Sequence, residues 1–150
     1  LFFFKHTPEY EIRLSLVGSE MCIRDRDNEI KNIIEQMFFT MYEEKGIGLA
    51  ATQVNIHKRI IVIDVSENKD KKIFLINPEI ISLSDDIDTM EEGCLSYPDL
   101  FLKITRPKKI IVKYEDADKK IHKLKLDELA SRIFQHEYDH MEGITYRQLI

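Results

Sequence analysis

Hydrophobic residues recur at helical spacing in the region that follows position 27. The apolar positions are Ile30, Ile33, Ile34, Met37, Phe38 and Met41. Steps of three and four residues place these side chains on one side of a helix, so the pattern predicts an amphipathic helix over about 28–44. Asp27 is suited to cap the start of this helix, and Gly46 is suited to end it.

Short runs rich in β-branched residues predict strands in the middle of the chain. RIIVIDV at 59–65 and IFLINPEII at 73–81 are two such runs. Two further runs, at 110–114 and 121–126, flank the turn-rich segment EDADKK. This arrangement predicts a β-hairpin.

A second helix is expected near the C-terminal end of the chain. Asp127 is a good N-cap residue, Glu128 would lie in the first turn, and the helix would run to about Met141. Gly143 is suited to terminate it. The order helix, strands, helix predicts an α+β fold with mostly antiparallel sheets.

The 150 residues suit a single domain, which we place at 27–150. The segment 1–26 fits this plan poorly, because it begins without Met and its part LSLVGSEMCIRDR has no clean periodicity. That part resembles translated sequencing-linker read-through in assembled environmental sequence, so we expect segment 1–26 to be non-native and the natural N-terminus to be missing. We expect 14–26 to be irregular and remote from the functional site, and Cys22 to have no role there.

Composition and charge limit the classes of protein that this chain can be. Hydrophobic residues make up 43% of it, and no apolar run approaches the roughly 18 residues of a membrane helix. We therefore expect a soluble, intracellular protein. The formal net charge of −5 argues against nucleic-acid binding, and two cysteines are too few for a disulfide scaffold.

An H-E-x-x-H pattern, HEYDH at 136–140, lies within the second predicted helix. Four residues advance a helix by about 400°, so His136 and His140 lie on one face, about one turn apart, where they can bind one metal ion. Glu137 lies beside them and in this pattern is usually a general base rather than a ligand. A charged surface helix that matches the pattern by chance is the alternative.

Cys94 is the candidate for a third metal ligand. Gly93 before it permits a tight backbone, and Pro98 is expected to end the local structure. One thiolate and two imidazoles suit iron(II), zinc, nickel or cobalt, and three protein ligands leave a fourth position for water, as in catalytic sites. A small buried hydrophobic side chain is the alternative for Cys94.

The segment GIGLAATQ at 46–53 is rich in small residues. Such residues let the backbone approach a ligand closely, and the Gln53 amide can donate to a carbonyl oxygen. A phosphate-binding loop is disfavoured, because no G-K-[ST] follows the glycines. By itself the segment is also typical of a turn between a helix and a strand.

Taken together, three segments carry a resemblance to a known family. GIGLAATQ from Gly46, EGCLS from Glu92 and QHEYDHMEG from Gln135 occur in this order. They resemble the signature of the peptide deformylases, which is G-x-G-L-A-A-x-Q, E-G-C-L-S and Q-H-E-x-D-H-x-x-G. The similarity extends over about 27–147.

The resemblance implies a fold and an activity. It implies mostly antiparallel sheets packed around a central metal-binding helix. It also implies a hydrolase that removes the N-formyl group from the N-terminal formylmethionine of newly made polypeptides and releases formate. The implied cofactor is one divalent metal ion, Fe2+ in the native protein, with Zn2+, Ni2+ or Co2+ as alternatives.

Site residues follow from the same resemblance, position by position. It implies Cys94, His136 and His140 as the metal ligands and Glu137 as the general acid and base. The side chain of Gln53 and the backbone N–H of Leu95 are implied as the pair that polarises the formyl carbonyl.

The methionine side chain of such a substrate needs an apolar pocket. Ile47 is one candidate, between Gly46 and Gly48, whose small size would let the backbone approach the substrate. Leu129 and Ile133 are the others, and Ile133 lies three residues before His136 on nearly the same helix face. Ordinary core packing is an equal alternative for Leu129.

Further charged residues are expected to play supporting or surface roles. Glu92 and Arg106 could form a buried pair that holds the cysteine loop. Asp139 is expected to face away from the metal, as an exposed charge or as an orienting residue. His57 and His122 are expected on the solvated surface.

Two other functions fit parts of the sequence. A zincin-type protease also uses H-E-x-x-H, but no downstream motif supplies its third ligand. In a structural metal module, His57, His122 or Cys22 would close a fourth position. The chain stops at Ile150, where relatives often continue into a helix associated with ribosome docking, so ribosome contact has no support in this sequence.

Overall fold

The structure, a computed structural model, describes residues 23–94 and 97–144. Two long helices flank a series of strands. The elements in chain order are α2 (Ile23–Glu43), β1 (Gly48–Ala50), the short 3-10 helix η1 (Ala51–Val54), β2 (Ile60–Ile63), β3 (Ile73–Leu83), β4 (Ile87–Cys94), β5 (Tyr97–Pro107), β6 (Lys109–Glu115), β7 (Ile121–Asp127) and α3 (Glu128–Met141).

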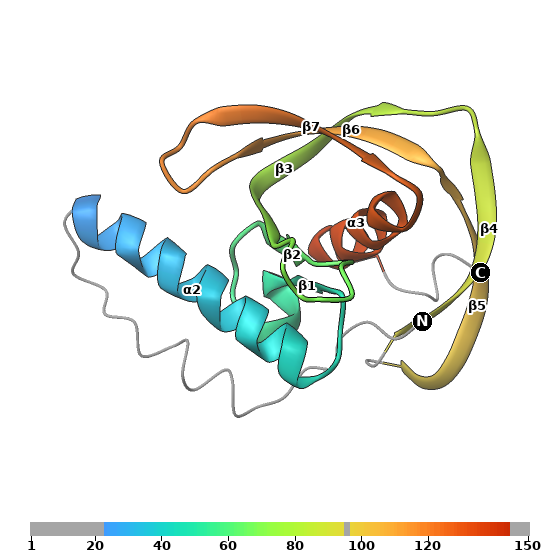
Figure 1. Cartoon of the computed structure of the whole chain (residues 1–150), viewed down its shortest axis with the longest axis horizontal. Coiled ribbons are helices and arrows are strands. Elements are labelled where there is room, and N and C mark those ends of the chain that lie inside the picture. The colour runs from blue at the N-terminus through green and yellow to red at the C-terminus, as the bar shows by residue number, and fades with distance from the viewer. Residues whose placement is uncertain (1–22, 95–96, 145–150) are drawn as a thin grey trace.

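Two antiparallel sheets surround helix α3. One has five strands in the order β1-β2-β3-β6-β7, and the other consists of β4 and β5. In Figure 1 the strands arch over α3, with β4 and β5 at one end of the arch and β1 and β2 in front. The predicted α+β class with a central helix is confirmed.

The predicted helices and strands are present, with one wrong boundary. Helix α2 begins at Ile23, so Asp27 lies inside it and is not its cap. No glycine or proline interrupts IRDRD, and acidic residues are favourable near a helix N-terminus. Residues 23–26 are therefore helical, whereas we expected an irregular segment; the expectations for 1–22, Cys22 included, lie outside the described residues.

Both helices end in the same hydrogen-bonded motif. In α3 the Gly143 N–H donates to the His140 carbonyl, and the Ile144 N–H donates to the Asp139 carbonyl. Gly143 has a φ of 73°, which a glycine adopts at little cost. At the end of α2 the left-handed residue is Lys45, with a φ of 57°, and Gly46 follows it.

Asp127 occupies the predicted N-cap position of α3, but its side chain makes no capping hydrogen bond. The backbone N–H of Glu128 instead donates to the Lys108 carbonyl at 2.9 Å. The start of α3 is therefore tied to Lys108, the residue between β5 and β6, and not to a side-chain cap.

The sequence pattern did not predict the hairpin of β4 and β5, nor the short elements β1 and η1. Strand β4 reads IDTMEEGC and shows no alternation of apolar residues. Pro98 was expected to end the local structure, but it lies inside β5. The register shifts between Gly93 and Cys94, and this irregularity accommodates a proline that a regular ladder would exclude.

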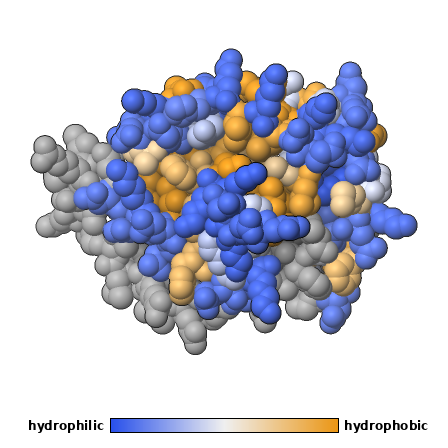
Figure 2. Space-filling model, in the orientation of Figure 1, coloured by the Kyte–Doolittle hydropathy of each residue, from blue (hydrophilic) through white to orange (hydrophobic). Residues whose placement is uncertain are grey.

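Apolar side chains join the helices to the five-stranded sheet in two clusters. One lies between α2 and the strands β1 and β2, and includes Met37, Met41 and Val62. The other lies between α3 and strands β1 to β3, β6 and β7, and includes Leu75, Val112 and Phe134. Figure 2 shows hydrophobic side chains gathered across the middle of one face, between hydrophilic rims.

In the part of the chain that the structure describes, no helix is both long enough and apolar enough to cross a membrane.

Candidate metal centre

Cys94, His136 and His140 converge from two elements. Cys94 ends β4, whereas the two histidines lie one turn apart on α3. One potential ligand atom from each residue lies within 4.8 Å of the other two. The Cys94 Sγ is 3.5 Å from His140 Nε2, and the two histidine Nε2 atoms are 3.1 Å apart. A single metal ion placed between them could contact all three.

The space and the protonation states at this point suit a metal ion. A gap of about 10 Å³ is lined by the three residues together with Tyr97, Arg106, Asp139 and Ile144, which is about the space that one water-sized sphere needs. Burial lowers the pKa of His140 to about 3 and also lowers the pKa of His136. Both imidazoles are therefore neutral at pH 7, and a metal ion requires this form.

Glu92 fixes the orientation of His136. The His136 Nδ1–H donates to Glu92 Oε2 at 3.1 Å, which leaves Nε2 as the atom that could bind a metal ion. Burial raises the pKa of Glu92, but the hydrogen bonds from His136 and Arg106 outweigh it and bring the value to about 2. Glu92 is therefore ionised, as this acceptor role requires.

The predicted buried pair of Glu92 and Arg106 is present. Arg106 Nε donates to Glu92 Oε1 at 2.7 Å, and a second guanidinium nitrogen donates to Oε2 at 3.0 Å. Arg106 also donates to Asp139 at 2.9 Å. Asp139 is thus a half-buried partner of Arg106 at the edge of the gap, and the expectation of an exposed charge is wrong. Burial raises the pKa of Asp139, and the ion pair with Arg106 offsets this shift only in part.

Glu137 lies on α3 next to His136 and is completely buried. Among the described residues, neither of its carboxylate oxygens accepts a hydrogen bond. Burial raises its pKa to about 8, although the nearby Ala50 backbone N–H and the charge of Arg106 oppose the shift. A buried carboxyl group of this kind can take up and release a proton near neutral pH.

Gly48 brings strand β1 close to Glu137. A Cβ added to Gly48 would lie 2.5 Å from Ile133 Cγ2 and 3.0 Å from Glu137 Oε1. The glycine therefore allows close contact between strand and helix. The small residues of GIGLAATQ let a backbone approach closely, as the sequence indicated, but here the backbone approaches α3.

Gln53 is buried in η1, directly after β1. Its Oε1 accepts a hydrogen bond from the Ala50 N–H at 2.9 Å. This bond identifies the oxygen end of the amide, so Nε2 is the end that can donate to a ligand. Leu95, the other predicted donor, lies outside the described residues.

The three side chains predicted for an apolar pocket differ in their surroundings. Leu129 is half-buried and lines a cavity of about 330 Å³ together with Met90 and Arg132. Ile47 is half-buried, and Ile133 is fully buried behind Gly48.

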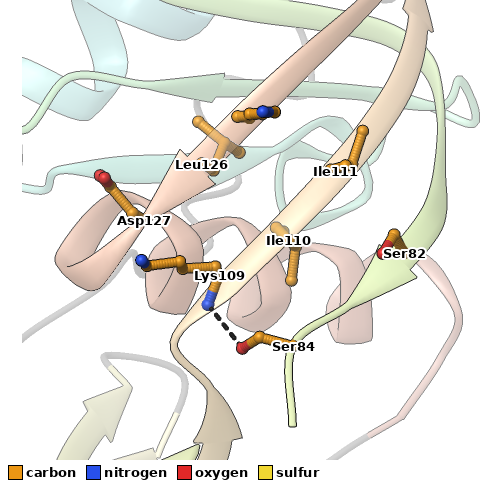
Figure 3. A pocket seen from close by; sticks show the side chains of 8 residues that line it. Ser82, Ser84, Lys109, Ile110, Ile111, Leu126 and Asp127 are labelled. Atoms are coloured by element: carbon orange, nitrogen blue, oxygen red, sulfur yellow. Dashed lines mark hydrogen bonds between the residues drawn. The ribbon is translucent and has the colours of Figure 1, made fainter. Parts of the chain in front are cut away.

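His57 and His122 are exposed, as the sequence predicted, and neither belongs to the three-residue group. A structural metal module closed by either histidine is therefore contradicted. Another cavity, of about 350 Å³, lies on β3, β6 and β7 between Ser82, Ser84 and Lys109 (Figure 3). The ligand group does not line this cavity, so it has no part in the metal centre.

Sequence reasoning missed one buried residue, Arg132. It is 3% exposed and donates to Glu92 Oε1 at 2.7 Å. A signal was available, because Arg132 lies four residues before His136 and hence on the same face of the predicted helix.

Comparison with known proteins identifies the family. The family model for polypeptide deformylase matches residues 13–150. Peptide deformylase 1 of Pseudomonas syringae pv. tomato is 47% identical over 117 residues, which cover 78% of this chain and 70% of that protein. Peptide deformylase of Hydrogenovibrio crunogenus is 45% identical over 126 residues, 83% of this chain and 74% of that protein.

Solved structures agree with the sequence comparison. The crystal structure of peptide deformylase from Thermotoga maritima superposes with a TM-score of 0.77 at 35% identity, and covers 100% of this chain and 98% of that chain. The family model, the relatives and the fold all agree, and Cys94, His136 and His140 meet at one point in this chain. This chain therefore belongs to the polypeptide deformylase family, and it is a hydrolase that removes the N-formyl group from the N-terminal formylmethionine of newly made polypeptides.

Proposed function

We propose that Cys94, His136 and His140 are the ligands of one divalent metal ion, and that the native ion is iron(II). The observation that carries the proposal is their convergence within 4.8 Å. The donor set is a thiolate and two neutral imidazoles, which suits iron(II), zinc, nickel or cobalt. Three protein ligands leave a coordination position open to water and substrate.

Glu137 is the proton carrier in this proposal. When bound, the metal supplies Lewis-acid chemistry that makes a hydroxide nucleophile available near neutral pH. Glu137 accepts the proton of the attacking water and then passes it to the nitrogen of the cleaved formamide. The products are formate and a free amino terminus, and their atoms all come from the water and the formyl amide. The raised pKa of Glu137, about 8 from burial, suits a group that both takes and gives a proton.

Gln53 and the Leu95 backbone N–H are proposed to stabilise the negative charge that develops on the formyl oxygen. The support for Gln53 is its anchored carbonyl, which accepts from Ala50 at 2.9 Å and thereby orients the donating end of the amide. Removing one donor of this kind costs about 3–4 kcal/mol of transition-state stabilisation in other enzymes.

The substrate is proposed to lie along Gly46, Ile47 and Gly48, with its methionine side chain towards Leu129. The support is a cavity of about 330 Å³ beside Leu129 and Met90, which is next to the proposed ligands because Arg106 lines both this cavity and the gap between the ligands. Ile133 would support the substrate indirectly, because its side chain packs against Gly48 of β1. We place the activity in the bacterial cytoplasm, because the relatives from Pseudomonas syringae and Hydrogenovibrio crunogenus are bacterial peptide deformylases.

The test separates metal binding from chemistry. Glu137→Gln should keep the metal after dialysis while turnover of a formyl-Met peptide falls by about 100-fold or more. Cys94→Ala should lose the metal, because it removes one of three protein ligands. If Glu137→Gln loses its metal as readily as Cys94→Ala, or keeps near-normal turnover, the role assigned to Glu137 is wrong.

A further inference from the structure

Arg132 makes three hydrogen bonds from a buried position on α3. Its guanidinium donates to Glu92 Oε1 at 2.7 Å, to the Ile104 carbonyl at 3.0 Å and to the Asp88 carbonyl at 2.8 Å. Glu92 and Asp88 belong to β4, and Ile104 belongs to β5. A single side chain therefore binds both strands of the hairpin that carries Cys94.

The hairpin has little apolar material to hold it against α3. Its cluster of buried hydrophobic residues, as far as the structure describes them, consists of Cys94 and Ile104, with Tyr97 and Leu102 packed beside them. Hydrogen bonds from α3 therefore add a directional attachment for this hairpin. Arg132 lies one helical turn before His136, so it makes this attachment next to the ligand group.

Arg106 does not replace Arg132 in this role. Arg106 lies on β5 and pairs with Asp88 of β4 in the register of the hairpin. Its two bonds to Glu92 therefore hold the hairpin together internally, and its hydrogen bond to α3 goes to the Asp139 side chain. Arg132 comes from α3 itself and contacts the hairpin backbone directly.

We propose that Arg132 is a positioning residue, which fixes where the Cys94 thiolate lies relative to His136 and His140 and thereby sets the geometry and affinity of the metal site. The proposal rests on the ligand set proposed above. Residues that orient metal ligands in this way typically change metal affinity by about 10–100-fold when they are replaced.

Positioning and electrostatics predict opposite changes in metal affinity when Arg132 is replaced by an uncharged residue. Glu92 and Asp139 balance Arg106 and Arg132 within the buried cluster. Replacing Arg132 by methionine leaves the cluster with a net negative charge, which by Coulomb attraction should tighten the binding of a divalent cation. Loss of positioning should weaken it. The direction of the change in metal affinity therefore separates the two effects.

The experiment uses Co2+ as the probe on the full chain. Arg132→Met, Arg132→Lys and the parent are compared for Co2+ affinity and for the thiolate-to-cobalt absorption band, at a temperature where circular dichroism shows each to be folded. Arg132→Met should bind Co2+ roughly 10–100-fold more weakly, with a weakened or shifted band. Arg132→Lys keeps the charge but lacks the planar guanidinium group that reaches several acceptors. Its Co2+ affinity should therefore lie between those of the parent and Arg132→Met.

Arg59→Met is the matched control. Arg59 also pairs with a carboxylate at the end of α3, Glu142, at 2.7 Å, but both side chains are largely exposed. This variant should match the parent in Co2+ affinity and spectrum. Equal changes in Arg59→Met and Arg132→Met would overturn the proposal.

The remaining outcomes are decisive as well. Parent-like or tighter Co2+ binding with an unchanged band in Arg132→Met overturns the proposal, even if its melting temperature falls. If Arg132→Met does not fold, Arg132→Lys decides in the same way: a parent-like band and affinity overturn the proposal, and weaker binding supports it. A parent that lacks the thiolate band shows instead that the proposed ligand set is wrong, and this inference fails with it.

Discussion

Helix α3 meets its two sheets by different kinds of contact. Against the five-stranded sheet it buries apolar side chains such as Ile133 and Phe134, which are 0% exposed. Against the hairpin of β4 and β5 it places Arg132, which binds Glu92 and two backbone carbonyls. One interface is apolar, and the other is a network of charged hydrogen bonds.

The two interfaces contribute differently: the apolar one mainly stabilises the fold, and the polar one fixes the positions of individual atoms. Burial of apolar surface is favourable but has no preferred direction, so it can hold a sheet on a helix without fixing any single atom. Charged hydrogen bonds have short, directional geometry. Cys94 ends the strand that is held in this second way, and its sulfur must meet two histidines on α3. We therefore expect substitutions in the polar interface to affect both the fold and the metal site, and substitutions in the apolar interface to affect mainly the fold.

The largest expected effect comes from breaking the polar interface at Glu92. Glu92→Gln removes the carboxylate that the buried Arg106 and Arg132 share, and Arg106 then keeps Asp139 as its charge partner. The charge of Arg132 is left uncompensated, which should lower the free energy of unfolding by about 3–5 kcal/mol. Chemical denaturation measures this change. Glu142→Gln is the control, because its pair with Arg59 is exposed and should contribute about 1 kcal/mol or less. Equal losses in both variants would contradict the comparison.

Breaking the apolar interface should affect stability in a different way. Leu75 in β3 is 0% exposed, so Leu75→Ala should lower the free energy of unfolding by about 2–5 kcal/mol. Metal content after dialysis should remain at the parent value. Leu83 lies at the end of the same strand and is 56% exposed, so Leu83→Ala should cost about 0.5 kcal/mol or less. Loss of metal from folded Leu75→Ala would show that the two interfaces are not separable.

A smaller effect is expected where β1 touches α3. Gly48→Ala places a methyl group 2.5 Å from Ile133 Cγ2, so strand or helix must shift at a cost of about 1–3 kcal/mol. Gly46→Ala is the matched control, since its added carbon would meet Met41 at an ordinary 3.5 Å. Thermal unfolding of the two variants should differ clearly. If both melt like the parent, the close approach at Gly48 is not required.

The smallest effect concerns a polar tie between α2 and the residue that follows β2. The Tyr42 hydroxyl donates to Asp64 Oδ2 at 2.6 Å. Burial raises the pKa of Asp64, but hydrogen bonds from Ser66 and Tyr42 outweigh it, so the pKa is lowered. A lowered pKa stabilises the fold above the ordinary value of about 4, and this stabilisation is lost as pH falls through the folded-state pKa.

Tyr42→Phe tests this tie. It should lower the free energy of unfolding by about 1 kcal/mol at pH 7. The difference from the parent should shrink as pH falls below about 4, where Asp64 of the unfolded chain is protonated first, towards the lower pKa of Asp64 in the folded protein. Urea unfolding at pH 7 and pH 3 measures both values. A difference that stays constant between the two conditions would contradict the role of ionised Asp64.

Local pattern in the sequence was sufficient for much of this fold. The spacing of apolar residues predicted α2, and β-branched runs predicted β2, β3, β6 and β7. The spacing of His136 and His140 on a helix made their convergence a consequence of α-helical geometry alone. Gly143 ended α3 as predicted, because only the residue type and the helix end were needed to foresee a left-handed backbone there.

Tertiary structure alone decided how Cys94 reaches the histidines. Strand β4 carries few apolar residues, so its local pattern resembles a surface loop, and its place in the fold depends on Glu92, Arg106 and Arg132 meeting from distant parts of the chain. The sequence suggested that Glu92 and Arg106 pair, but it did not show that Arg132 joins them from α3, because burial of a charge becomes favourable only when its partners are assembled together. Sequence by itself therefore determined the two histidines as a pair, whereas the third candidate ligand acquired its position from a charge network that exists only in the folded chain.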